Sequence, residues 1–219
     1  WDGGTSTVTN NDGSIASQVR ANPSAGFSIV SFDPGSTTGD QSVGHGLNDA
    51  PGLILLKNRE DAGNWIVFDS SACTTVRKLL RLNTADGVAT EGSNIWGGSL
   101  PSSTTFGVTV TVSAAQNKDH IAYCFAPVAG YSSMGIATGT GTTDGPFIHT
   151  GFKVRFLIYK RSDGTSNWLI YDTARNPSNP GLYVLSADNS GGGNTYDAHN
   201  NQLGVDFLSN GFKIRSSNG

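Results

Sequence analysis

Carboxylates are the side chains of this sequence that could cleave a sugar chain. Glycoside hydrolysis generally uses two carboxyl groups, about 5–5.5 Å apart for retention or about 6.5–9.5 Å apart for inversion. The chain has two glutamates, Glu60 and Glu91, and Glu60 lies in the turn-like stretch "KNREDAGN". No E-x-D-x-x-E strand is present, which leaves only a pair of aspartates for this chemistry. We therefore expect no enzyme, with a polysaccharide depolymerase as the less favoured alternative.

Histidines and cysteines, the usual zinc ligands, are scattered along the chain. No two histidines have H-x-H or H-x-x-x-H spacing, and no cysteine lies within three residues of His45, His120, His149 or His199. Two cysteines, Cys73 and Cys124, are too few for a disulfide scaffold. The loop "DNSGGGNTYDAHNN" at 188–201 carries oxygen donors that calcium accepts, but Gly/Asn loops are usually turns. We expect no metal and no cofactor.

Two polar loops could bind a glycan through an aromatic ring. The stretch "EGSNIWGG" at 91–98 contains Asn94 and Trp96, and the stretch "TYDAHNN" at 195–201 contains Tyr196, Asp197 and His199. An aromatic ring can stack on the C–H face of a sugar while amide groups bind its hydroxyls. The favoured interpretation is that each ring anchors its own loop by packing, and glycan binding is the alternative.

A phrase that occurs twice organises the sequence. The segment "KNREDAGNWIVFD" at 57–69 matches "KRSDGTSNWLIYD" at 160–172, an offset of 103 residues. Trp65 and Trp168, followed by Asp69 and Asp172, could be a sugar platform with an acceptor. The favoured interpretation is structural: each tryptophan fills the same core position in a duplicated unit, and each aspartate ends a strand by binding a turn.

The repeat divides the chain into a linker or the end of a preceding unit at 1–13, a first copy at 14–119 and a second copy at 120–219. Within each copy, apolar residues alternate with period two, as in "FSIVSF" and "FGVTVTV", and turn signals separate the runs. The segment "TTVRKLLRL" at 74–82 has helical spacing, but its counterpart "PGLYVLS" follows a proline, so we expect strands in both. The fold class is all-β: two tandem antiparallel β-sandwich repeats, or one larger jelly roll made from both copies.

The charge and hydropathy of the sequence restrict the classes of partner that we expect for this chain. The net charge is −3, charged residues make up 14% of the chain, and no basic block occurs, so we expect no nucleic acid as a partner. No apolar run approaches 18 residues, so we expect no membrane span.

Several stretches together resemble a repeated domain of virion structural and tail-fibre proteins of marine bacteriophages: "GSIASQVRANPSAGFSIVSF", "GHGLNDAPGLILLKNREDAGNWIVFD", "YCFAPVAGYSSMG", "DGPFIHTGF" and "DFLSNGFKIR". The resemblance implies a concanavalin-like β-sandwich that is made in the host cytoplasm and assembled into the virion. It implies a spacer and adhesion role in a tail fibre, spike or capsid-surface appendage, as a homo-oligomer (a trimer) with other virion proteins as partners. It supplies no catalytic residues. A lectin-like module that binds host surface glycan is the alternative.

Overall fold

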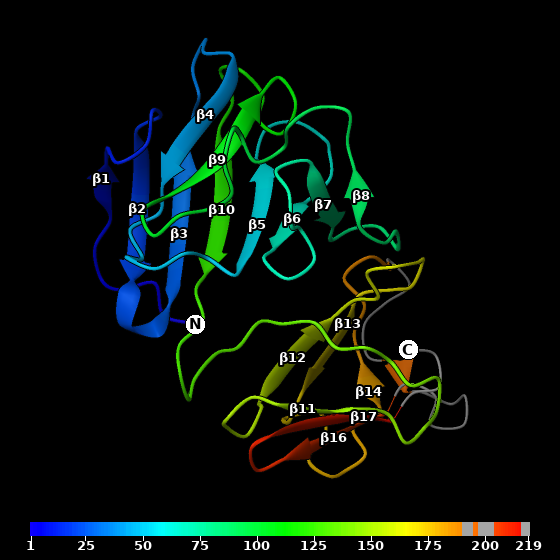
Figure 1. Cartoon of the computed structure of the whole chain (residues 1–219). Helices are drawn as coiled ribbons and strands as arrows, with labels where there is room; N and C mark the ends of the chain where they lie inside the picture. Colours follow the sequence, from blue (N-terminus) through cyan, green and yellow to red (C-terminus); the bar gives the residue numbers. More distant parts are fainter. Residues whose placement is uncertain (190–194, 197–203, 216–219) are drawn as a thin grey trace. The chain divides into compact units, whose positions relative to one another are not determined.

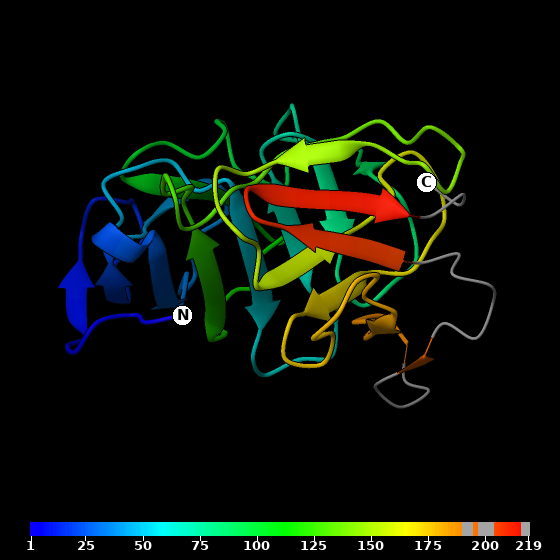
Figure 2. The ribbon, with the colours of Figure 1, turned by 90° about the horizontal axis from the view of Figure 1, so that it is seen from below.

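The computed structural model describes residues 1–189, 195–196 and 204–215, with the backbone alone at 195–196. It divides into two compact units, drawn in Figure 1 and, from below, in Figure 2. Unit 1 comprises Trp1–Leu82 and Val88–Val128, all of them described residues, and unit 2 comprises Asn83–Gly87 and Ala129–Gly219. We describe each unit by itself.

Unit 1 is built around one eight-stranded sheet in which every paired neighbour is antiparallel. In the order in which they lie side by side, its strands are β1 (Val8–Asn10), β2 (Ser17–Asn22), β3 (Phe27–Phe32), β10 (His120–Phe125), β5 (Leu53–Asn58), β6 (Ile66–Asp69), β7 (Lys78–Arg81) and β8 (Ala89–Thr90). The single turn of 3-10 helix, η1 (Pro23–Ala25), joins β2 to β3.

A second layer covers one face of this sheet. It consists of β4 (Gly39–Gly44) and β9 (Thr105–Val110), paired antiparallel with Val43 opposite Phe106. Apolar side chains from both layers form one core because each strand turns every second residue inward. The core includes Val30, Ile54 and Val108, all with 0% exposure. Unit 1 is therefore an antiparallel β-sandwich, as the alternating pattern predicts.

Unit 2 contains smaller sheets in its described residues. Its strands are β11 (Phe147–His149), β12 (Phe156–Tyr159), β13 (Leu169–Asp172), β14 (Tyr183–Val184), β15 (Thr195–Tyr196), β16 (Gly204–Leu208) and β17 (Gly211–Arg215). They form the order β11-β17-β16 and the pairs β12-β13 and β14-β15, again antiparallel. Tyr171 and Val205, both at 0% exposure, are central to its core. No α-helix occurs in either unit over the described ranges, so the all-β prediction is confirmed.

The two copies of the repeated phrase have the same strand register. Leu55 pairs with Val67 in β5 and β6, and Ile158 pairs with Ile170 in β12 and β13, so both partners keep the offset of 103 residues. The backbone agreement continues on both sides of the hairpin. It covers 52–73 in unit 1 and 155–176 in unit 2, and the equivalent hydrogen bonds are Ser70 N to Gly52 O and Thr173 N to Arg155 O, then Cys73 N to Asp69 O and Asn176 N to Asp172 O.

The units do not coincide with the ranges 14–119 and 120–219 that the repeat predicts. Strand β10, which opens the second copy in sequence, lies in the middle of the unit 1 sheet between β3 and β5 (Figure 1). Residues 1–13 also differ from a plain linker, because β1 pairs with β2. The boundary moves because a strand belongs to the sheet that satisfies its backbone hydrogen bonds, wherever its sequence relatives lie.

The segment with helical spacing is partly a strand. Within 74–82, Lys78–Arg81 forms β7, and within its counterpart 180–186, Tyr183–Val184 forms β14. Over the described residues, none of the helical structure is long and apolar enough to cross a membrane.

Candidate functional site

Strand β10 lies in the middle of the unit 1 sheet and joins β3 to β5. All six of its residues pair with β3 on one side and with β5 on the other; Tyr123, for example, lies opposite both Ile29 and Leu55. Alternate residues of β10 direct their backbone N–H and C=O groups toward β3 and toward β5. Ala126 N donates to Gly26 O on the β3 side, and Arg59 N donates to Asp119 O on the β5 side.

The side chains of β10 also serve two faces. His120, Ala122 and Cys124 point into the core and have 0% exposure. Ile121 and Tyr123, on the opposite face, are half-buried. An apolar strand with both edges bonded and one face fully buried is a central strand, and the sheet would be split into two without it.

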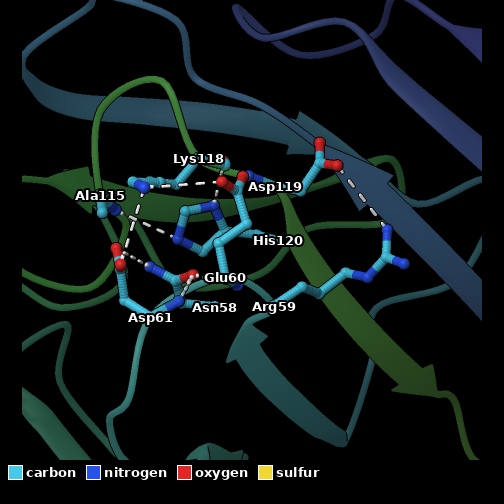
Figure 3. Close-up of polar contacts among 8 residues, drawn as sticks. All are labelled: Asn58, Arg59, Glu60, Asp61, Ala115, Lys118, Asp119 and His120. Carbon is cyan, nitrogen blue, oxygen red and sulfur yellow. Dashed lines mark hydrogen bonds and ion pairs between the residues drawn. The ribbon is translucent and has the colours of Figure 1, made fainter.

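A cluster of polar residues holds the start of β10 against the loop after β5 (Figure 3). We call it the β10 clamp, and it consists of Asn58–Asp61 together with Lys118–His120. The Glu60 carboxylate accepts a hydrogen bond of 2.6 Å from the backbone N–H of Asp119. The Lys118 ammonium lies 3.5 Å from Glu60 and 3.6 Å from Asp61.

The loop side of the β10 clamp is shaped by Asn58. Its side-chain oxygen accepts the backbone N–H groups of Glu60 (2.9 Å) and Asp61 (3.0 Å), which turns both carboxylates toward the start of β10. On the other side of the loop, the Arg59 guanidinium lies 3.8 Å from the Asp119 carboxylate. These ion-paired side chains are 36–55% exposed, so each pair contributes only about 0–1 kcal/mol. Their combined effect is to fix the register of β10.

His120 is the buried member of the β10 clamp, and its side chain points into the core. Its Nε2 accepts the backbone N–H of Ala115 at 3.1 Å, so its Nδ1 carries the proton and donates to Lys118 O at 2.8 Å. The imidazole stacks on Phe32 at 5.2 Å. Burial lowers the pKa of His120, since a charged ring would lose its hydration. The histidine is thus a neutral spacer between the loop and the sheet.

Trp96 was a candidate for glycan binding, with a packed loop anchor as the favoured interpretation, and the structure places its ring in the core. Its ring has 0% exposure, its Nε1 donates to Lys78 O at 2.8 Å, and it meets Phe68 edge to face at 5.4 Å. The loop reaches inward because it crosses directly over β9. A Cβ at Gly107 would lie 2.0 Å from the backbone oxygen of Trp96. Trp96 is thus packed as a loop anchor, as the favoured interpretation has it.

The other predicted glycan residues are divided. Asn94, partly buried, donates its amide to the Asp40 carboxylate at 2.8 Å, an interaction that ties the loop to β4. Tyr196 belongs to β15 by its backbone, opposite Tyr183. Asp197 and His199 lie outside the described residues.

The repeated tryptophans do not have equal burial. Trp168 is 5% exposed, and its backbone N–H donates to the Asp188 carboxylate at 3.0 Å. Trp65 is only half-buried and stacks on Tyr123 at 6.3 Å, outside the main core. The prediction of a shared core position therefore needs correction at both sites, because Trp65 lies outside the main core of unit 1 and Trp168 lies outside the core of unit 2 that contains Tyr171. The Trp65 ring lies over the face of the sheet opposite the core because it precedes β6 in the phase of Val67.

The repeated aspartates do have the same structural task. Asp69 accepts the backbone N–H groups two and three residues later, at 2.9 and 3.0 Å, and Asp172 does the same at 3.0 and 2.9 Å. Burial raises the pKa of Asp69, whereas hydrogen bonding to Arg175 lowers the pKa of Asp172. Both carboxylates end a strand and shape the following turn.

Other chemically capable groups in the described chain are engaged in packing. Cys73 and Cys124 are free, buried thiols, and burial raises their pKa values to about 11 and about 12. Within the ranges that the structure describes, no three side chains of His, Cys, Asp and Glu gather in a way that could hold a metal ion. The arrangement that stands out is the β10 clamp, whose polar contacts hold the start of β10 against the loop after β5. From the sequence alone, Glu60 is interpreted as a solvated turn residue. The available signal for an ion pair is the acidic Glu60 in "NRED" and the basic Lys118 in "NKDH".

Comparison with known proteins gives one match. Residues 1–219 match the model of a family described as a domain of unknown function (DUF7483). Comparison with curated proteins and with solved structures found no match. The family match covers both units, including the described β10 strand that opens the second copy. The chain therefore belongs to the DUF7483 family.

Proposed function

We propose that this chain is a non-enzymatic structural module of a bacteriophage virion, in a tail fibre, spike or capsid-surface appendage, where it serves as a spacer and adhesion element. The observation that supports it is the place of β10. The first strand of the second copy completes the sheet of unit 1, so consecutive copies are linked by shared sheet structure as well as by the covalent chain. Tension along the chain between the two copies would act on β10, which is hydrogen-bonded on both edges within unit 1.

The use of the chemically capable residues is in keeping with a structural role. Asp69 and Asp172 bind turns, His120 and Cys124 are buried in the sheet, and Trp96 anchors a loop. A general acid, a base or a nucleophile must reach a substrate. The groups in this set are instead committed to backbone partners or to the core.

The test is the composition of the particle. Virions of a phage that encodes this chain are purified and quantified by mass spectrometry, and an antibody against the chain locates it by electron microscopy. We expect peptides of the chain at multiple copies per particle and label on an appendage or on the capsid surface. Absence of the chain from purified virions would overturn the proposal.

Oligomeric state and activity are checked on the purified chain. We expect a homo-oligomer, a trimer by the resemblance, in sedimentation velocity, and we expect no release of reducing sugar from host polysaccharide. A glycan array tests the adhesion role separately from the structural one. Turnover of polysaccharide would replace the proposal by the depolymerase alternative.

A further inference from the structure

The β12 edge of unit 2 differs from the equivalent β5 edge of unit 1. The β5-β6 and β12-β13 hairpins have the same register, with Leu53 opposite Asp69 and Phe156 opposite Asp172. Strand β5 has β10 on its other side. In the described chain, β12 belongs to a two-stranded sheet with β13. Among the residues that the structure describes, the unit 2 hairpin thus has one strand fewer than its equivalent in unit 1.

The backbone of β12 is oriented to receive that strand. In antiparallel sheets, alternate residues of a central strand bond to alternate neighbours. The hydrogen bond from Thr173 N to Arg155 O sets the phase, so Leu157 and Tyr159 bond to β13. Ile158 then directs its N–H and C=O away from β13. Its equivalent in unit 1, Leu55, directs the same groups at Tyr123 of β10.

Side-chain burial shows where coverage is missing. Ile54 and Leu56, which point into the core from β5, have 0% and 1% exposure. Their equivalents in β12, Leu157 and Tyr159, are only partly buried although they pack against the core of unit 2. A strand laid along β12 would cover these side chains and remove apolar surface from water, at roughly 25 cal/mol per Å².

The loop after β12 retains one carboxylate of the β10 clamp. Asp163 stands in sequence where Glu60 stands in unit 1, and its side chain is 77% exposed beside Arg161. In the β10 clamp, Glu60 receives both the basic Lys118 and a backbone N–H from the start of the strand. A strand that begins with a basic residue would meet this carboxylate, which already pairs with Arg161 at 2.7 Å.

We propose that the edge of β12 is an acceptor site for an extended polypeptide segment of the β10 type, which begins with a basic residue and alternates large apolar side chains. The segment adds antiparallel to β12, with the residue equivalent to Tyr123 opposite Ile158. Main-chain hydrogen bonds supply binding and the alternate apolar side chains supply selectivity, as in other cases of strand addition. The inference rests on strand register and burial alone, and so it holds whether or not the chain is a virion protein.

The experiment uses the full chain and a fluorescent synthetic peptide with the sequence of residues 118–127, carrying Cys124→Ser. Binding is measured by fluorescence anisotropy, and the site is located by hydrogen exchange. We expect saturable binding and slower exchange of the Ile158 amide in the complex. No binding up to millimolar peptide would overturn the proposal, as would protection confined to β5, which would mean exchange with the resident β10.

Two N-methylated peptides form a matched pair of controls. In β10, the N–H of Tyr123 faces β5, whereas the N–H of Ala122 faces β3. Methylation at Tyr123 should weaken binding at least about tenfold, because it removes one hydrogen bond and places a methyl group against the ladder. Methylation at Ala122 should leave binding within about twofold, within the scatter of a change that breaks no hydrogen bond. Equal losses from both peptides, or protection of Ile158 in the concentrated chain without peptide, would refute the donor-strand mode.

Discussion

Replacing Trp96 by alanine should destabilise unit 1 more than any other single tryptophan substitution in that unit. The ring has no exposed surface and spans the core from the loop to Phe68. Truncation of a buried Trp to Ala costs about 3–5 kcal/mol. Part of that cost is the hydrogen bond from Nε1 to Lys78 O, at about 1 kcal/mol. With total stabilities of about 5–15 kcal/mol, the variant lies near the limit of folding.

The matched control is Trp65→Ala. Trp65 is half-buried, and its stacking on Tyr123 contributes about 0.5–1.5 kcal/mol beyond the area it buries. We therefore expect a loss of about 1–2 kcal/mol for this variant, less than the loss at Trp96. A glycan-platform role for Trp96 gives the opposite order, since a surface ring can be removed with little effect on folding.

The assay exploits the two cysteines of the chain, both buried in the core of unit 1. A short pulse of thiol reagent at pH 8, after equilibration in urea, labels Cys73 and Cys124 only where unit 1 is open. With a urea m-value of about 2 kcal/mol per M, Trp96→Ala should lower the labelling midpoint by about 1.5–2.5 M. Midpoints that fall equally in the two variants, or further for Trp65→Ala, would refute the placement of the two rings.

Three further expectations concern the polar groups. Asp69→Asn should change the free energy of unfolding by less than about 0.5 kcal/mol, because burial disfavours the Asp69 charge. Asp172→Asn should cost about 1–2 kcal/mol, because the charged partner Arg175 favours the Asp172 carboxylate. Urea unfolding measures both changes. Burial lowers the pKa values of His45 and His120 in the folded chain below the ordinary value of 6.5. Below pH 6.5 the unfolded chain therefore binds more protons than the folded chain. The free energy of unfolding should then fall by up to about 1.4 kcal/mol per pH unit for each histidine, until the pH reaches that histidine's folded pKa. Denaturation curves between pH 7 and pH 5 measure this slope, and a flat profile would contradict it. Glu60→Gln should lower stability by less than about 1 kcal/mol, since the amide oxygen still accepts the backbone N–H, whereas Glu60→Ala should speed exchange of the amides at the start of β10.

Local pattern in the sequence was enough to predict the strands and their turns. The alternation in "NWIVFD" and its copy predicted β6 and β13, and the aspartate at the end of each phrase indicated the turn that follows. These features depend on residues close in sequence, where period and turn chemistry determine the structure. The conflict between helical spacing and a proline-flanked counterpart at 74–82 was likewise resolved correctly in favour of β7.

Features that depend on distant contacts were not predictable in the same way. Trp96 lies among Gly, Ser and Asn, a composition typical of a solvated loop, and it is buried because Gly107 lets the loop lie against β9. Similarly, Glu60 looked like a solvated turn residue until the backbone of Asp119 was brought beside it. Each outcome depends on which segment packs over which strand, and a single sequence does not encode that in a local pattern.

The position of β10 gives the most general lesson about repeated β-chains. Sequence similarity marks where a segment was copied, whereas hydrogen bonding decides which sheet a strand completes, and the two need not have the same phase. Strand β10 begins the second copy yet bonds on both edges within unit 1. A shift of this kind has a structural consequence: each unit built from such copies depends on a strand that begins the next copy. The proposed acceptor edge at Ile158 is the equivalent of the β5 edge that β10 occupies in unit 1.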